Sequence, residues 1–290
     1  MKKLRISAFD VINIFVLCVL CFVFIMPLVT VVSSSLISIR ESARRGSYVV
    51  IPEVIDITAY KLLLRRTSNI YRAYGVTIMR VLAGTFANLL FTSTLAYGLS
   101  KRKLPGLGFF TSFCFLTMLF SGGLIPTYIV VRMTGVTNTF WAMIVPSLVG
   151  VWNLLIMRTF FWQIPESLSE SAEIDGASEW RVFLRIFLPL SVPSLVTVGM
   201  FYAVGHWNAW FDAAIYINRW DLKPLQIILR DMVSNMAQTD VMMQGTDVTL
   251  IPDATLRCAT IVVSTVPILC IYPFLQKYFI KGAMVGAVKG

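Results

Sequence analysis

The sequence predicts an all-α integral membrane protein in which residues 1–290 form a single domain with six transmembrane helices. Hydrophobic residues make up 57% of the chain and charged residues only 14%, whereas soluble domains carry about 25% charged residues. The mean hydropathy is +0.76. The apolar residues are collected in runs that suit a bilayer core, which a helix of about 20 residues crosses. Between these runs no stretch is long enough for a soluble domain.

Each predicted span is an apolar run bounded by polar residues. The first run follows Lys2, Lys3 and Arg5 and is too long for the core of a signal peptide, so we expect it to be retained as a span. Longer polar segments follow the first and the fifth spans. The six predicted spans cover residues 11–36, 74–99, 107–131, 139–157, 186–205 and 254–274.

The orientation is predicted from the short basic turn Lys101-Arg102-Lys103 between the second and third spans. Short basic loops lie on the cytoplasmic side of a membrane. With six spans, both termini and the loop at 165–185 are then cytoplasmic, and the protein is a multi-pass protein of the plasma (inner) membrane. The segment 38–73, placed outside, is also rich in arginine, which argues in the opposite direction.

Several polar residues and glycines fall inside the predicted spans. Arg80, Asn88 and Asn153 would be costly against lipid, so we expect them to face the interior of the bundle. For Arg80 we favour a side chain that reaches back to the interface. Asn153 lines a path or bonds to a neighbouring helix. Gly122 and Gly123 either open the third span or allow close helix packing.

The polar loop at 165–185 predicts a helix, a tight turn and a second helix. Ser167 and Glu170 have the spacing of a capping box. Gly176 is expected to end the first helix in the left-handed conformation, and Ser178 to cap the second. Spacings of three and four residues place an acidic face on the first helix. That face consists of Glu166, Glu170 and Glu173.

This loop resembles the signature loop of the permease subunits of binding-protein-dependent ABC importers with the MetI-like fold. The matching residues are Glu170-Ser171-Ala172, Gly176, Ile186 and Leu188-Pro189, with Ser171 where the family usually has alanine. The resemblance implies a type I importer permease fold whose coupling helix docks into a groove on an ATPase subunit. It assigns that contact to Glu170, Ala172, Glu173, Asp175 and Gly176. The alternative is an amphipathic helix that only caps the bundle.

A second resemblance is to the carbohydrate-importing members of that family. It rests on the aromatic stretch 205–212 and on the segments 122–126 and 157–161. An aromatic belt at the membrane interface explains the stretch 205–212 as well, and we prefer it to a sugar contact. The candidate residues of a substrate path are Asn153, Trp207, Asn208, Trp210 and Asp212. The tail also resembles the family, and Gly286, Lys289 and Gly290 are then expected to contact the ATPase; the alternative is a frayed basic end.

The resemblance implies a permease subunit that imports an oligosaccharide by alternating access and is similar to permeases for polysaccharide fragments. It implies several partners: a second permease subunit in a heterodimer, an ATPase dimer, an extracytoplasmic sugar-binding protein and the lipid bilayer. No Walker-type loop occurs, so ATP and Mg²⁺ are expected on the ATPase and no cofactor on this chain. The net charge of +10 is spread over loops, which favours lipid headgroups over nucleic acid.

Two other classes of function remain as alternatives. A membrane-embedded enzyme would need a nucleophile with a base or a metal cluster, but the chain has a single histidine, His206, and no G-x-S-x-G or H-E-x-x-H motif. The five cysteines lie in or beside apolar runs and are expected to be packing residues. A passive channel or scaffold differs from an importer in the ATP dependence of transport. The basic residues of segment 38–73 suit acidic oligosaccharides, but they suit an acidic binding protein or lipid headgroups better.

Overall fold

The computed structural model describes residues 8–64, 70–231 and 253–287, and within them it contains helices and loops but no strand. This confirms the all-α fold class. The elements are α1 (Ala8–Ser34), α2 (Ile39–Arg45), α3 (Thr58–Leu63), α4 (Ile70–Ser100), α5 (Leu107–Leu119), α6 (Leu124–Met133), η1 (Phe140–Met143), η2 (Val145–Ser147), α7 (Val151–Phe161), α8 (Glu166–Ile174), α9 (Glu179–Val182), η3 (Phe183–Phe187), α10 (Leu188–Leu190), α11 (Val192–Asn208), α12 (Phe211–Tyr216), η4 (Trp220–Leu222) and α14 (Asp253–Ala287).

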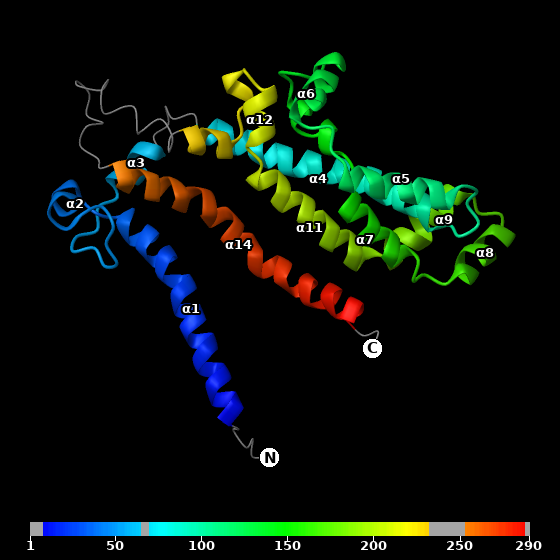
Figure 1. Cartoon of the computed structure of the whole chain (residues 1–290), viewed down its shortest axis with the longest axis horizontal. Coiled ribbons are helices and arrows are strands. Elements are labelled where there is room, and N and C mark those ends of the chain that lie inside the picture. Colours follow the sequence, from blue (N-terminus) through cyan, green and yellow to red (C-terminus); the bar gives the residue numbers. More distant parts are fainter. Residues whose placement is uncertain (1–7, 65–69, 232–252, 288–290) are drawn as a thin grey trace. The chain divides into compact units, whose positions relative to one another are not determined.

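Backbone contacts divide the chain into two units, residues 1–71 with 229–268 and residues 72–228 with 269–290. The single domain predicted for residues 1–290 stays a prediction. Figure 1 shows that, in the second unit, α11 runs beside α7, with which it makes its main packing contacts, and that α8 stands at one end of the unit.

In the first unit, the end of α1 is tied to the segment that follows it. Ser33 donates from Oγ to the carbonyl of Val50 (2.6 Å), and Ser34 Oγ accepts from the backbone N–H of Val49 (3.0 Å). Glu41 on α2 is buried and accepts from Arg45 (2.9 Å) and from the N–H of Glu53 (2.9 Å). Part of the arginine content of segment 38–73 therefore forms ion pairs within the chain.

The second unit has a core in which α4, α7, α9, η3 and α11 meet. Phe161, Phe183 and Phe187 are buried there, and the rings of Phe161 and Phe187 pack edge to face at 5.7 Å. The element η3 is π-helical, which displaces Phe183 and Phe187 relative to a regular α-helix. Since lipid is as apolar as these side chains, close packing rather than exclusion from water holds this core together.

The number of six transmembrane helices is not confirmed. Among the described residues, α1 from Phe9 to Ser34 and α4 are long and apolar enough to cross a membrane as single helices. Three bent helix pairs are long and apolar enough when taken together, each as a broken span or a re-entrant loop: α5 with α6 at 117°, η1–η2 with α7 at 55°, and the helix 179–190 with α11 at 82°. Counting each pair as one span makes five. The helix α14 is 35 residues long, and the part of it whose side chains the structure describes includes the apolar stretch Ala254–Cys270.

The break between α5 and α6 has a local cause. Gly123 has φ +86°, a conformation that glycine adopts without strain. A Cβ on Gly123 would meet nothing within 4 Å, so this glycine turns the chain and does not serve close packing. The sequence left two roles open for Gly122 and Gly123, an opening of the third span or close helix packing. At Gly123 the structure supports the opening of the span.

A different glycine permits the closest approach of two helices. Gly84 on α4 faces His206 on α11, and a Cβ at this position would overlap the imidazole ring, with Cδ2 and Cε1 both at 2.8 Å. Small residues allow transmembrane helices to come this close.

We expect Gly84→Ala to destabilise the protein by about 1–3 kcal/mol, because the added methyl group must displace His206 from its site. Gly75→Ala on the same helix is the matched control, since a Cβ there meets nothing within 4 Å. The measurement is the thermal unfolding midpoint of the detergent-purified protein. Equal midpoints for the two variants would contradict the close approach.

Candidate functional site

A polar stripe runs along one face of the otherwise apolar helix α4. Its members follow each other at spacings of three or four residues, which places them on the same helix face. All of them are buried, and Arg80 is only 1% exposed. The stripe consists of Thr77, Arg80, Gly84, Asn88 and Thr92.

This stripe binds backbone groups that the broken fourth span leaves without helix partners. Arg80 Nη2 donates to the carbonyl of Met143 (3.2 Å), and Asn88 Nδ2 donates to the carbonyls of Ser147 (2.6 Å) and Leu148 (3.0 Å). Non-helical backbone at membrane depth is tolerated only where the protein satisfies it. The stripe therefore allows η1 and η2 to exist inside the bundle.

Tyr202 on α11 completes this network. Its hydroxyl accepts from the N–H of Gly150 (2.9 Å), so its own proton is free to bond Thr92 Oγ1 at 2.7 Å. The tyrosine thereby links α11, α7 and the stripe on α4.

Arg80 forms an ion pair with Asp212 at the start of α12. Nη1 lies 3.2 Å from Oδ1, Nη2 contacts Oδ2, and Nη1 also donates to the carbonyl of Ala209 (3.3 Å). The expectation that Arg80 reaches back to the interface was wrong. A guanidinium this deeply buried needs an opposite charge and hydrogen-bond acceptors, and Asp212 together with two carbonyls supplies them.

The hydrogen bond between His206 and Asn88 determines the tautomer of the histidine. Asn88 uses Nδ2 for two carbonyls, so Oδ1 faces His206 Nε2 at 2.8 Å. Nε2 must therefore carry the proton, and Nδ1 of the neutral ring keeps its lone pair.

These polar side chains line a cavity of about 330 Å³ between α4 and α11. Its wall includes Arg80, Asn88, Tyr202, His206 and Asp212, with Phe201, Gly205 and Ala209 beside them. The spacing of the stripe in the sequence is the signal from which Thr77, Arg80, Gly84, Asn88 and Thr92 could have been recognised together.

Of the five predicted path residues, only Asp212 lines this cavity. Trp207 is buried beside Tyr74, with ring centroids 6.4 Å apart, so it does not face lipid as the preferred aromatic belt requires. Asn208 is exposed at the end of α11, and the ring of Trp210 packs on Phe211 (5.4 Å). Asn153 is half-buried on α7 next to Gly150, which lines the cavity.

The predicted loop at 165–185 forms two helices, α8 and α9, with a glycine turn between them. Gly176 has φ +78°, its N–H donates to the carbonyl of Glu173 (3.0 Å), and the N–H of Ala177 donates to Ala172 (2.8 Å). This pair of bonds is a Schellman motif, so the predicted stop at Gly176 is confirmed. Ser178 occupies the cap of α9 in an extended conformation, but its side chain makes no capping bond.

The predicted capping box was wrong. The helix α8 begins two residues earlier, with Pro165 instead of Ser167 as N-cap, and Ser167 lies inside it. The tight turn that ends α7, where Ile164 N–H donates to Phe161 (3.2 Å), brings Pro165 to the cap position. The carbonyl of Ser167 then accepts from Ser171 Oγ (2.8 Å).

The acidic face of α8 lies against the basic turn between α4 and α5. Lys103 Nζ is 3.2 Å from Glu170 and 3.7 Å from Glu166, and Lys101 Nζ is 3.6 Å from Glu173. The hydrogen bond to Glu170 is the main reason that the pKa of Lys103 is raised. Lys101 also reaches Glu179 at the start of α9, at 3.0 Å.

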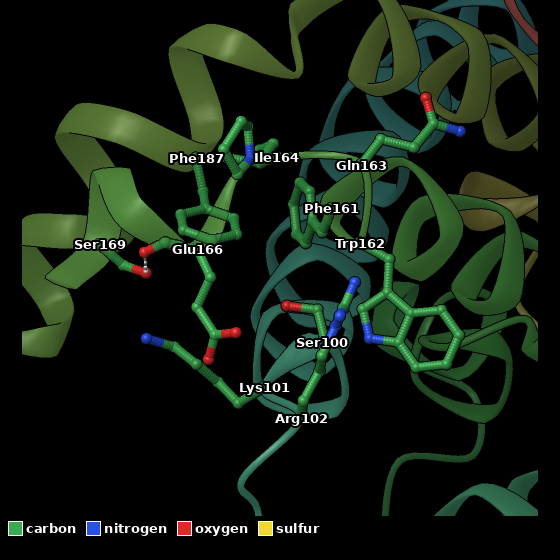
Figure 2. A pocket seen from close by; sticks show the side chains of 11 residues that line it. Ser100, Lys101, Arg102, Phe161, Trp162, Gln163, Ile164, Glu166, Ser169 and Phe187 are labelled. Atoms are coloured by element: carbon green, nitrogen blue, oxygen red, sulfur yellow. Dashed lines mark hydrogen bonds between the residues drawn. The ribbon is translucent and has the colours of Figure 1, made fainter.

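A small pocket of about 220 Å³ lies at this junction. Figure 2 shows the side chain of Lys101 extending beneath the carboxylate of Glu166, and Ser169 Oγ donating to the carbonyl of Glu166 (2.9 Å). The α4–α5 turn and the start of α8 thus share one polar surface.

The exposed surface of α8 carries the partly exposed carboxylates, two serines and two large apolar side chains. Ile174 is 87% exposed, and Leu168 is exposed as well. Ala172 packs against the core instead, and Asp175 is the exposed C-cap residue. In the tail, Gly286 lies in the last turn of α14, whereas Lys289 and Gly290 lie outside the described residues.

No family model matches the sequence. The chain is 42% identical over 286 residues to Protein LplC of Bacillus subtilis, covering 97% of this chain and 95% of that protein. It is 38% identical over 268 residues to the polygalacturonan/rhamnogalacturonan transport system permease protein YtcP of the same organism, covering 92% and 93%. A chain in the crystal structure of a bacterial ABC transporter involved in the import of the acidic polysaccharide alginate superposes with a TM-score of 0.84. That chain is 25% identical, and the match covers 96% of this chain and 99% of that one.

We expect Asp212→Asn to destabilise the protein by about 3 kcal/mol, because it leaves the buried guanidinium of Arg80 without its counter-charge. The matched control is Asp221→Asn, which removes one carboxylate from the exposed pair Arg219–Asp221 and should change stability little. Thermal unfolding of the purified protein measures both. A loss of stability for Asp221→Asn as large as for Asp212→Asn would show that burial of the ion pair is not the cause.

Proposed function

This chain belongs to the permease subunits of carbohydrate ABC transporters, and on that premise we propose that it moves an oligosaccharide across the plasma membrane by alternating access, driven by a separate ATPase. Such permeases are integral membrane proteins and not enzymes. They work with another permease subunit, an ATPase and a substrate-binding protein. In our proposal the permease partner is a different chain, the ATPase is a dimer that carries ATP and Mg²⁺, and both termini of this chain are cytoplasmic.

The observation that carries the coupling part of the proposal is the geometry of α8. It is a short helix that ends in a Schellman turn, exposes Ile174 and is joined through α9 and η3 to the core of its unit. In our proposal α8 docks into a groove on the ATPase with the segment 170–176. The apolar residues Ile174 and Leu168 make the contact, and the carboxylates of Glu166, Glu170 and Glu173 hold α8 to the basic turn.

Two connections lead from α8 to the cavity on α4. The first is electrostatic. Lys101 and Lys103 lie just after the end of α4 and form ion pairs with carboxylates of α8 and α9. The second is packing, since Phe183 and Phe187 of η3 contact Tyr97 of α4 at 5.1 and 4.8 Å between ring centroids. When the ATPase dimer closes, α8 moves and α4 moves with it. The docking site and the cavity then have coupled states, as an energy-driven transporter requires.

The proposed substrate is a fragment of a plant or microbial polysaccharide. Support comes from the names of the relatives, which include permeases for polygalacturonan or rhamnogalacturonan and for arabinooligosaccharides, the latter 24% identical to this chain. The cavity supports this because it offers hydroxyl, amide, imidazole and carboxylate groups beside the aromatic ring of Phe201. The tail residues Gly286, Lys289 and Gly290 are proposed to contact the ATPase.

Gly176→Pro tests the coupling role. Proline cannot adopt φ +78° and has no N–H for the bond to Glu173, so the turn between α8 and α9 is lost. We expect the reconstituted complex to assemble but to lose stimulated ATP hydrolysis and oligosaccharide uptake. Gly135→Pro is the control, because Gly135 also has a positive φ (+73°) and donates to a helix carbonyl, that of Arg132, outside the docking segment. Undiminished uptake by an assembled Gly176→Pro complex would reduce α8 to a cap of the bundle.

Ile174→Ser tests the apolar docking contact. Removal of an exposed isoleucine should leave the folding of this chain intact and weaken its association with the ATPase by about tenfold, which corresponds to about 1.4 kcal/mol. The control is Ile51→Ser, because Ile51 is similarly exposed (73%) in the first unit. Retention of the ATPase during purification of the complex is the measurement. Equal retention in both variants would exclude Ile174 from the contact.

A further inference from the structure

We propose that the cavity on α4 is a sugar subsite that accepts an uncharged, hydroxyl-bearing ring and disfavours a carboxylate. This inference rests on the proposed function, and it assigns to this chain a selectivity that a basic transport path would not have. It follows from which hydrogen-bonding groups on the cavity wall are already used and which remain available.

The size of the cavity suits a small part of an oligosaccharide. A volume of about 330 Å³ is near the lower end of the 300–1,000 Å³ typical of ligand pockets. Gly205 and Ala209 contribute little side-chain volume, and Phe201 offers an aromatic surface for a sugar ring. One or two rings would occupy this space, so the rest of a longer substrate lies elsewhere.

Most hydrogen-bond donors on the cavity wall already bond to acceptors within the protein. The terminal nitrogens of Arg80 donate to Asp212 and to the carbonyls of Ala209 and Met143. Its Nε is buried, so a ligand in the cavity cannot reach it. Both N–H groups of Asn88 bond to carbonyls of the fourth span. The proton on His206 Nε2 bonds to Asn88. The Tyr202 hydroxyl already has two partners, the N–H of Gly150 and the hydroxyl of Thr92. A carboxylate entering the cavity would therefore find no donor on Arg80, Asn88 or His206.

Acceptors remain available on the same wall. The Asp212 carboxylate has room for about four hydrogen bonds, of which Arg80 takes two and the N–H of Ala213 one (2.8 Å). Among the described residues His206 Nδ1 has no hydrogen-bond partner, so its lone pair is open. Sugar hydroxyls can donate to both groups. The carboxylate group of a uronate can only accept hydrogen bonds, and at Asp212 it would also meet a like charge.

The consequence concerns where the charge of an acidic substrate would be recognised. If the transported oligosaccharide carries uronates, this cavity binds its hydroxyl groups, and its carboxylates are bound outside the cavity. Arg80, the single cation of the wall, serves the architecture of the bundle and not the binding of an anion.

The test places a cysteine on the cavity wall. Gly205 lines the cavity, and a Cβ there meets nothing within 4 Å, so Gly205→Cys fits without displacing a neighbour. The variant is prepared in the full transporter complex, with the five native cysteines replaced by alanine. The readout is the rate of maleimide labelling with trigalacturonate or its uncharged methyl ester present. Gly108→Cys on α5 is the matched control, because its Cβ is equally unobstructed and outside the cavity.

We expect the methyl ester to protect Cys at 205 and the free acid to need at least about a tenfold higher concentration for the same protection. Neither compound should protect at position 108. In the added variant Asp212→Asn the guanidinium of Arg80 loses its counter-charge, so the free acid should protect at least as well as the ester. These outcomes together support the subsite.

Equal protection by acid and ester, or better protection by the acid in the presence of Asp212, would overturn the selectivity. If neither the acid nor the ester protects the introduced cysteine from maleimide, the cavity is not a sugar subsite. Uptake by the wild-type complex is measured with the same two compounds and a wider set of oligosaccharides. Uptake without protection contradicts only the subsite, whereas a complex that transports no oligosaccharide contradicts the proposed function.

Discussion

The structure depends on one constraint, which is that backbone groups freed by a broken helix inside a membrane must find partners. The fourth span is interrupted at η1 and η2, and each unsatisfied group there would cost several kcal/mol in lipid. Arg80, Asn88 and Tyr202 bond to these groups. A hydrogen bond between membrane helices contributes only about 0.6–2 kcal/mol. The polar stripe is therefore needed less for the stability it adds than for the cost it avoids.

The same requirement explains why a cavity forms where it does. A helix that carries buried polar side chains cannot turn them to lipid, so α11, α12 and the broken fourth span gather around that face of α4. Gly84 lets His206 approach, and Asp212 neutralises Arg80. The space left between these committed groups is lined by their remaining acceptors. In the proposed subsite, the side chains that hold the bundle together would also contact the sugar.

At its other end, α4 is joined to the docking helices by exposed ion pairs. Individual pairs of this kind contribute little to stability. Lys101 and Lys103 nevertheless hold four carboxylates on two helices, which fixes the direction of α8 relative to α4. The contact of Tyr97 with Phe183 and Phe187 adds a packed connection. These contacts connect α8 and α9 to one end of α4, the long helix whose polar stripe lines the cavity.

The sequence by itself determined the helical membrane class, the apolar runs and the turn at Gly176, because composition and glycine stereochemistry act locally. It did not determine that three spans are bent, since apolarity records burial and not the direction of a helix. It also could not pair Arg80 with Asp212, 132 residues away, or Lys103 with Glu170, 67 residues away. The expectation that Arg80 reaches the interface is wrong because it considers the arginine without its counter-charge. Only the tertiary structure decides such pairs, because the energy of a buried or clustered charge depends on which opposite charge the fold brings near it.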